Sequence, residues 1–133
     1  SNIVFMGMGE PLMNYNNVIK SIDKITSPEG LGMSSKRITV STSGVPKIIK
    51  KMADDEVKFN LAVSLHSAID SVRTSIMPFN ETFPLKDLGE SLVYWYEKTQ
   101  RVVTYEYIVW DGINDKKEDI KALVTLLKEC LTP

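Results

Sequence analysis

The sequence predicts an α/β fold of about four consecutive βα units around a mainly parallel sheet. Four apolar or β-branched runs, each suited to one strand, occur at Ile3 to Met8, Arg37 to Ser43, Lys58 to His66 and Val102 to Trp110. Each run is followed by apolar residues spaced as on one face of a helix. Strands that alternate with crossover helices lie parallel and are joined by right-handed connections, as in doubly wound sheets and (β/α) barrels.

The four helices are predicted from the periodicity of their apolar positions. In chain order these are Val18, Ile19, Ile22 and Ile25; Val45, Ile48, Ile49 and Met52; Leu85, Leu88, Leu92 and Trp95; and Ile120, Leu123, Val124 and Leu127. Residues 14–17 offer N-caps for the first helix, and Asp115 followed by Glu118 resembles a capping box before the last. Residues 67–84 form the longest irregular stretch, with one short helix expected at 69–75.

The composition is that of one soluble globular domain of 133 residues, 43% hydrophobic and 25% charged. The formal charge of −1 provides no basic excess for binding a phosphate backbone. No signal-peptide segment and no apolar run near the ~20 residues that cross a bilayer is present, so we expect a cytoplasmic protein without membrane contact. The single cysteine, Cys130, excludes an intrachain disulfide and a cysteine metal cluster. A further strand would be expected after Thr132-Pro133, so we expect a piece of a longer protein.

The most informative local pattern is the run from Phe5 to Pro11, in which an apolar strand leads into two glycines, a glutamate and a proline. Gly7 and Gly9 permit positive φ and close approach of a ligand, and Pro11 holds the residue before it extended. Glu10 is therefore predicted to point outward from a strand end. A fixed carboxylate suits a ligand ammonium or hydroxyl group, whereas a phosphate loop would carry a lysine.

Alternation along the second and third strands places polar side chains on one side of the sheet. Ser41 lies on the hydroxylated face of the second strand, and Ser64 and His66 share a face of the third. The C-terminal ends of parallel strands are where such folds bind ligands. We therefore expect Glu10, Ser41, Ser64 and His66 to converge at one rim.

Simpler roles remain open for these four residues. Glu10 could be a carboxylate exposed in a turn. Ser41 and Ser64 could be bonded locally to the backbone at their strand ends. His66, the only histidine, could be a rim residue whose hydrogen bonds are all made within the protein. Because no partner ligands accompany it, we expect no metal site.

Other polar and sulfur-containing residues receive weaker predictions. Glu106 lies mid-strand between two tyrosines, where a carboxylate needs a partner or a position in the lumen, so it is a secondary site candidate. Met6 and Met8 are expected to fill the core. Asn114-Asp115 is expected to cap a helix, and Cys130 to be a structural thiol.

Several blocks of sequence together resemble one family. Residues 6–12 (MGMGEPL), 36–44 (KRITVSTSG) and 62–67 (AVSLHS) closely resemble the radical SAM rRNA adenine-C2 methyltransferases, the RlmN/Cfr family. The resemblance continues through residues 104–107 (TYEY) and 111–115 (DGIND), so it covers essentially the whole chain. The order and spacing of the blocks make the resemblance specific.

The resemblance implies that residues 1–133 are the central fragment of a single radical SAM domain, a partial (β/α) barrel. By the same resemblance, Gly9 and Glu10 bind the amino group of S-adenosylmethionine (SAM), and Ser41 also contacts it. The Ser64-Leu65-His66 stretch lines the same site. The full enzymes cleave SAM reductively at a 4Fe-4S cluster and methylate C2 of an adenine in 23S rRNA, with tRNA as a second substrate for some members. A methylated cysteine carries the methyl group, and a reducing partner is required.

Departures from the family pattern limit what this chain can do alone. The C-x-x-x-C-x-x-C cluster motif and the methyl-carrying cysteine are absent, so the cluster ligands lie outside this chain and no catalytic residue is assigned to it. We expect the chain alone to be inactive. Its open sheet edges are expected to favour self-association. Three alternatives stay open: adenine-C8 methylation within the same family, a cluster-free module that binds SAM or a nucleotide, and a purely structural α/β domain.

Overall fold

The computed structural model describes residues 1–130 and contains one parallel sheet of four strands in the order β1-β2-β3-β4. The strands are β1 (Ile3–Phe5), β2 (Ile38–Thr42), β3 (Asn60–Ser64) and β4 (Thr104–Glu106). The helices are α1 (Tyr15–Thr26), α2 (Pro46–Asp54), α3 (Asp70–Ile76), α4 (Leu85–Thr99) and α5 (Lys117–Cys130). Three short 3-10 helices complete the described chain: η1 (Pro11–Asn14), η2 (Ser35–Arg37) and η3 (Pro78–Glu81).

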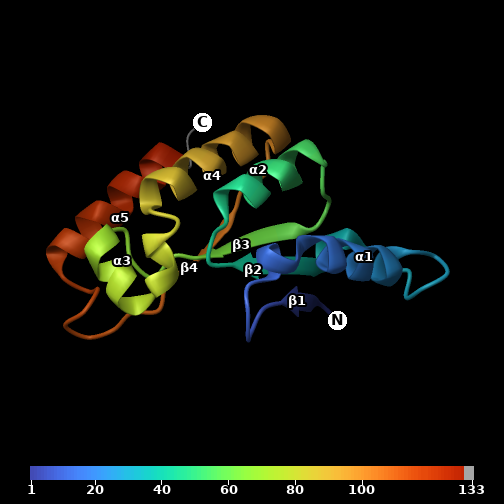
Figure 1. Cartoon of the computed structure of the whole chain (residues 1–133), viewed down its shortest axis with the longest axis horizontal. Helices are drawn as coiled ribbons and strands as arrows, with labels where there is room; N and C mark the ends of the chain where they lie inside the picture. Colours follow the sequence, from blue (N-terminus) through green and yellow to red (C-terminus); the bar gives the residue numbers. More distant parts are fainter. Residues whose placement is uncertain (131–133) are drawn as a thin grey trace.

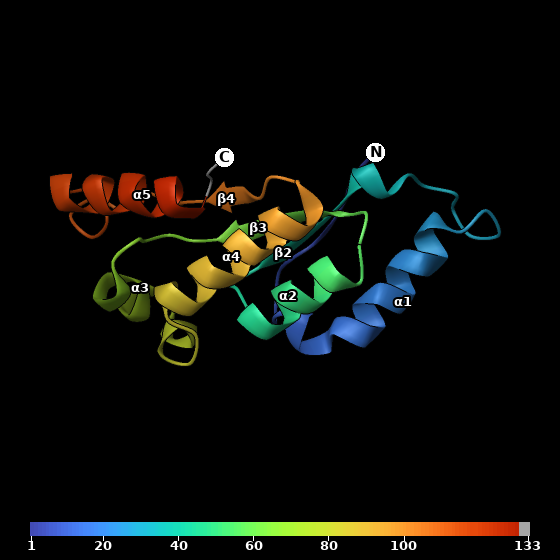
Figure 2. The ribbon, with the colours of Figure 1, turned by 90° about the horizontal axis from the view of Figure 1, so that it is seen from above.

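The strand order decides between the two predicted architectures. Successive right-handed crossovers that always advance in the same direction place all their helices on one face of the sheet. The order β1-β2-β3-β4 never reverses, and α1, α2 and α4 cover the same face (Figure 1 and Figure 2). A doubly wound sheet would reverse its order and carry helices on both faces. The chain is therefore α/β with the wall of a partial (β/α) barrel, as predicted.

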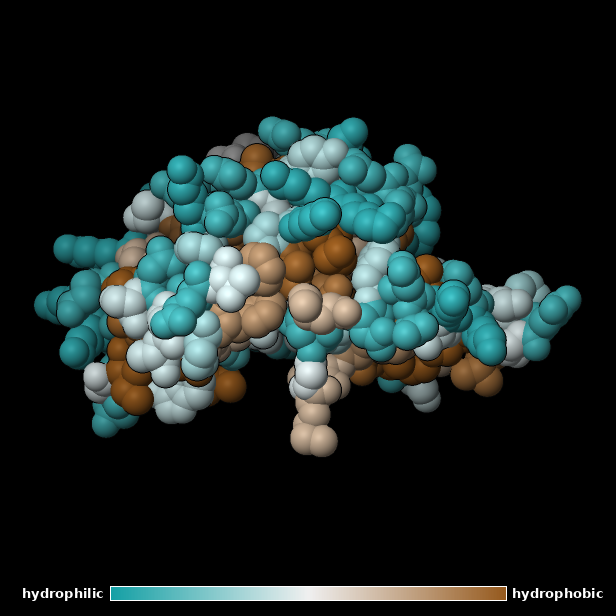
Figure 3. All heavy atoms as spheres, viewed as in Figure 1, coloured by the Kyte–Doolittle hydropathy of each residue, from teal (hydrophilic) through white to brown (hydrophobic). Residues whose placement is uncertain are grey.

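The core lies between the sheet and the helical layer. Trp95 and Leu88 of α4 and Ile49 and Met52 of α2 are fully buried and pack with buried strand residues such as Val40. The surface over the helices is mostly hydrophilic, and apolar side chains are visible in the gap between α1 and α2 and along the lower edge of the view (Figure 3). This packing confirms the predicted apolar faces of α2 and α4.

The strands are shorter than the apolar runs that predicted them. β1 ends at Phe5, β3 at Ser64 and β4 at Glu106, because the residues that follow leave the sheet to form loops at its C-terminal edge. The loop between β1 and α1 projects away from the body of the molecule (Figure 1). Met6 is 62% exposed and Met8 fully exposed on this loop, so the prediction that they fill the core is wrong.

Two helical details also differ from expectation. Asn14 precedes α1, but its side chain makes no capping hydrogen bond. At the start of α5 it is Asp119, not Glu118, that accepts a hydrogen bond from the Lys116 amide, at 3.0 Å. The predicted apolar face of α5 is only half covered, since Ile120 is 57% exposed. The strand expected after Thr132-Pro133 lies outside the described residues.

Candidate functional site

A cavity of about 440 Å³ opens at the C-terminal edge of the sheet, where loops from all four strands meet. Its lining residues are Met6, Gly7, Gly9, Glu10, Ser41, Thr42, Ser43, Ser64, His66, Glu106 and Ile108. The predicted convergence of Glu10, Ser41, Ser64 and His66 is therefore found in the structure. Leu65 is the one candidate from the sequence that does not line this cavity.

The Glu10 carboxylate is fixed by donors from two different elements. Its Oε1 accepts a hydrogen bond from the Leu12 amide, at 3.1 Å, and one from the Thr42 hydroxyl group. Its Oε2 accepts one from the Ser43 amide at 2.9 Å. The carboxylate thus joins the loop after β1 to the end of β2, and it is not a free side chain in an exposed turn. Thr42, which sequence reasoning missed, shares in this anchoring.

The glycines beside Glu10 adopt backbone conformations that other residues avoid. Gly7 has φ of +106° and Gly9 has φ of +91°, and a Cβ atom placed on either would meet no atom within 4 Å. The strain of positive φ, and not crowding by protein, therefore accounts for glycine at these positions. The open space above them lies along the cavity lining, where a ligand could approach the backbone closely.

A second carboxylate, Glu106 at the end of β4, organises the two serines. The Ser41 hydroxyl donates to Glu106 Oε2 at 3.2 Å, and the Ser64 hydroxyl donates to the same oxygen at 3.1 Å. The simpler alternative, in which the serine hydroxyls bond locally to the backbone, therefore does not hold: both donate to Glu106. Glu106 is a central member of the cavity and not a secondary one.

His66 is held in one tautomer by the loop that follows β4. Its Nδ1 accepts a hydrogen bond from the Ile108 amide at 3.1 Å, so a neutral imidazole carries its proton on Nε2. Its ring lies edge-on to Trp110 with centroids 5.8 Å apart, and its φ is +58°. Burial lowers the pKa of His66, against a smaller raising effect from Glu106. The ring is thereby kept neutral, with an N–H available for a ligand.

Leu65 belongs to the core and supports the site only through its backbone. Its side chain is fully buried, its amide donates to the Glu106 carbonyl at 2.9 Å, and its carbonyl accepts from Arg73 at 3.0 Å. Both backbone groups therefore already have protein partners.

Arg73 is a buried residue beneath the site, and no pattern in the sequence predicted this role. Only 1% exposed, it donates from Nη2 to the carbonyls of Ser43, at 2.7 Å, and Ser64, at 3.0 Å. Its Nη1 donates to Asn80 Oδ1 at 2.8 Å. Burial lowers the pKa of the guanidinium to about 10, which leaves it charged at neutral pH. Arg73 therefore joins the ends of β2 and β3 directly behind the cavity.

Asn114 closes the loop after β4 and does not act as a simple helix cap. Its buried side-chain amide donates to the carbonyls of His66, at 2.7 Å, and Ile108, at 2.8 Å, and its Oδ1 accepts from the Trp110 amide at 2.7 Å. The neighbouring Asp115 accepts from the Gly112 amide. These bonds fix the loop that holds His66.

Comparison with known proteins shows strong similarity over nearly the whole chain, although no family model matches. The "Probable dual-specificity RNA methyltransferase RlmN" of Christiangramia forsetii is 74% identical over 128 residues, which are 96% of this chain and 36% of that protein. The protein of the same name from Thermoanaerobacter sp. is 46% identical over 131 residues, 98% of this chain and 38% of that protein. A radical SAM methyltransferase from Sphaerobacter thermophilus superimposes with a TM-score of 0.93 and 38% identity over 98% of this chain and 38% of its own.

This stretch of sequence belongs to the RlmN family. The chain spans little more than a third of the length of the relatives it matches. The structural match also identifies the sheet as the radical SAM type of partial (β/α) barrel.

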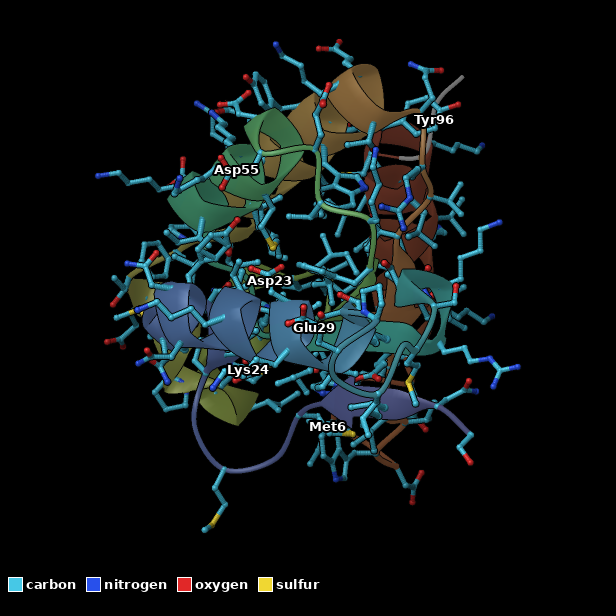
Figure 4. All side chains as sticks on the ribbon, turned by 90° about the vertical axis from the view of Figure 1, so that its right-hand side faces the viewer. Met6, Asp23, Lys24, Glu29, Asp55 and Tyr96 are labelled. Carbon is cyan, nitrogen blue, oxygen red and sulfur yellow. The ribbon has the colours of Figure 1, made fainter. Side chains whose placement is uncertain are left out.

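Among the other hollows in this segment, two lie beside packed helices and away from the C-terminal strand ends. The larger, about 690 Å³, runs between α1 and α2, and Figure 4 shows Asp23 and Asp55 coming from these two sides. There Tyr15 donates to Asp55 at 2.8 Å, and burial together with this bond raises the pKa of the tyrosine. A third hollow, of about 490 Å³, lies beside Cys130 and Gly89. Neither combines fixed carboxylates with strand-end glycines.

Within residues 1–130, no three histidine, cysteine, aspartate or glutamate side chains are grouped as metal ligands. In the same range, no helix is both long and apolar enough to cross a membrane. The thiol of Cys130 is buried 4.0 Å from the Gly89 carbonyl, which is consistent with a structural role.

Proposed function

We propose that this chain forms part of a radical SAM enzyme that methylates C2 of adenine in 23S rRNA and in tRNA, and that its strand-end cavity holds SAM. The observation that carries the proposal is the Glu10 carboxylate, fixed by three donors beside Gly7 and Gly9. The names of the relatives, dual-specificity RNA methyltransferases, support the reaction class.

The residues of the cavity fit the chemistry of SAM. A carboxylate has about four lone-pair positions, and Glu10 uses three of them for protein donors. One position is left for the ammonium group of the ligand, and charge-assisted hydrogen bonds of this kind are the strong ones. SAM also carries a positive sulfonium, and two carboxylates, Glu10 and Glu106, line the same cavity. We assign cofactor contacts to Gly9, Glu10, Ser41, Ser64 and His66, with Leu65 contributing through its backbone position.

Bound SAM, with an iron–sulfur cluster, would supply the methyl group and the one-electron chemistry of the reaction. The chain itself contains one cysteine, so a set of three cysteine ligands cannot come from it. Its own residues would bind and orient the cofactor: Glu10 through the amino group, and the serines and His66 through hydrogen bonds. We infer that the isolated chain binds SAM without turnover and that most RNA contacts lie outside it, because its net charge is −1.

Calorimetric titration with two ligands tests the cofactor assignment. SAM and 5′-methylthioadenosine share the nucleoside, but only SAM has the amino-acid group that Glu10 would hold. We expect Glu10→Gln to weaken SAM binding about 10- to 100-fold, the value of one charge-assisted bond, and to leave methylthioadenosine binding nearly unchanged. Glu29→Gln, at an exposed position in the loop after α1 (Figure 4), is the matched control. Equal effects of Glu10→Gln on both ligands would overturn the assignment of Glu10.

The reaction itself is tested in the longer protein that contains this chain. Mass spectrometry of nucleosides from treated 23S rRNA should show 2-methyladenosine, and Glu10→Gln should reduce it. Formation of 8-methyladenosine would place the enzyme with the C8 methyltransferases. SAM binding without any methylated product would support the cluster-free binding module instead.

A further inference from the structure

The only histidine of the chain lies in an unusual turn of the backbone. His66 has φ of +58°, a value that residues other than glycine seldom adopt. The Ser67 amide donates to the Leu65 carbonyl at 2.7 Å, so this hydrogen bond closes a three-residue turn around His66. Such a turn with positive φ at its centre is rare and strained. Strain of this kind persists only where the surrounding structure holds it, and it is found most often at functional sites.

Hydrogen bonds from neighbouring segments hold this turn. The Glu106 carbonyl at the end of β4 accepts from the amides of Leu65, at 2.9 Å, and His66, at 3.3 Å. The Leu65 carbonyl also accepts from Arg73 of α3 at 3.0 Å. The His66 carbonyl accepts from the side-chain amide of Asn114 at 2.7 Å. The backbone N–H and C=O groups of Leu65 and His66 therefore all have partners.

Asn114 connects this turn to the loop that holds the His66 ring. Only 1% exposed, Asn114 donates from Nδ2 to the carbonyls of His66 and Ile108. Its Oδ1 accepts from the Trp110 amide at 2.7 Å. The Ile108 amide in turn donates to His66 Nδ1, and the Trp110 ring lies edge-on to the imidazole. One buried side chain thus fixes the backbone of His66 and both residues that contact its ring.

We propose that Asn114 is a positioning residue that holds His66 in the strained turn, so that the imidazole is aimed into the cavity before a ligand arrives. This inference rests on the proposed function, in which His66 contacts the ligand, and it concerns a residue that does not itself line the cavity. Rotation about the N–Cα bond of His66 to the usual negative φ would swing its Cβ away from the present direction. A ring already in place spares the ligand the entropy of ordering it.

Two substitutions at residue 66 test the strain, because they differ in their tolerance of positive φ. His66→Gly and His66→Ala both remove the ring, but only glycine adopts φ near +58° at little steric cost. In urea unfolding, we expect the folding equilibrium constant of the glycine variant to exceed that of the alanine variant about 3- to 10-fold. The same pair at Lys20, an exposed position within α1, should show the reverse order. An alanine variant at residue 66 as stable as the glycine variant would overturn the strained turn.

NMR of the ligand-free chain tests the role of Asn114, because the one histidine gives ring signals that need no further assignment. We expect nuclear Overhauser contacts between the rings of His66 and Trp110 in the wild type and their loss in Asn114→Ala. Asn16→Ala, at an exposed asparagine of α1, is the matched control and should keep them. If Asn114→Ala fails to fold by circular dichroism, Tyr107→Phe replaces it and should weaken the contacts, since the Tyr107 hydroxyl donates to the Asn114 carbonyl at 2.6 Å. Contacts unchanged in the folded variant, or seen in the wild type only after SAM is added, overturn the proposal.

A double-mutant cycle with SAM shows whether Asn114 acts through His66. Asn114→Ala and His66→Ala should each weaken SAM binding about 3- to 10-fold, and the double variant should bind no more weakly than His66→Ala alone. Losses that multiply would mean that Asn114 supports the cavity by another route, and they would overturn its positioning role. The NMR and unfolding measurements need no ligand. Failure of the chain to bind SAM would therefore contradict the proposed function, while those measurements still decide the role of Asn114.

Discussion

Replacement of Arg73 by alanine is predicted to destabilise the fold more than any surface change and to disorder the cavity from behind. The guanidinium donates four hydrogen bonds, to the carbonyls of Leu65, Ser43 and Ser64 and to Asn80 Oδ1. Hydrogen bonds to charged groups contribute about 1.5–3 kcal/mol each, which gives at least roughly 6 kcal/mol for the set.

Burial of the charge offsets part of this gain. Burial lowers the pKa of Arg73 to about 10 from the model-compound value of 12.5. Such a shift corresponds to roughly 3 kcal/mol of desolvation that the alanine variant no longer carries. We therefore expect Arg73→Ala to lower the free energy of unfolding by about 3–5 kcal/mol, the range found when one partner of a buried charged network is removed.

Urea unfolding followed by circular dichroism measures this loss as a shift in midpoint at constant slope. Arg73→Lys keeps the charge but not the planar fork, so it should show an intermediate loss. Arg37→Ala, at an exposed arginine without side-chain hydrogen bonds among the described residues, should stay within about 0.5 kcal/mol of wild type. A loss below about 1 kcal/mol for Arg73→Ala would refute the reasoning.

Three further outcomes follow from the structure. Gly44→Ala should lower the free energy of unfolding in urea by about 2–4 kcal/mol, because φ is +104° and the new Cβ would lie 2.6 Å from Leu88 Cδ1. Gly32→Ala is the control: φ is also positive there but the space is open, so the loss should be about 1 kcal/mol. Burial lowers the pKa of His66 in the folded state, so the contribution of this residue to stability is complete above about pH 6.5 and is lost as the pH falls through the lowered value. His66→Asn should therefore lose less stability than wild type between pH 7 and 5. Equal slopes of the free energy of unfolding against pH in the two proteins would contradict this. The open edges of β1 and β4 should give dimers or larger species in light scattering, and a monodisperse 15.0 kDa monomer would count against strand pairing.

Local pattern was sufficient to predict much of the fold. The spacing of apolar residues alternates between a strand-like and a helix-like period along the chain, and this predicted the order of elements. The spacing is informative because it reflects which side of each element is buried. The apolar positions of α4, such as Leu88 and Trp95, are buried as their spacing predicted. Ile120 of α5 was also predicted to be buried but is exposed. Periodicity indicates a helix with an apolar face, but it does not show whether another element covers that face.

Only the site residues that lie at the ends of strands could be predicted from the sequence. Ser41, Ser64 and His66 follow from alternation and from the C-terminal edge rule. Arg73 and Asn114 could not be predicted, because they lie in or beside irregular segments. Their partners are set by tertiary packing: Arg73 reaches Ser43, 30 residues away, and Asn114 reaches His66, 48 residues away. Glu106 looked secondary because its two serine partners come from other strands.

Amide NMR spectra of the labelled chain titrated with SAM test most directly the proposal that the cavity between Glu10 and Glu106 holds SAM. We expect the largest shifts at Gly9, Ser43 and His66, whose backbones border the cavity or bond to its carboxylate. The larger hollow between α1 and α2 is the natural competitor, and its residue Phe59 reports on it. Shifts centred on Phe59, with Gly9 and His66 unchanged, would contradict the assignment.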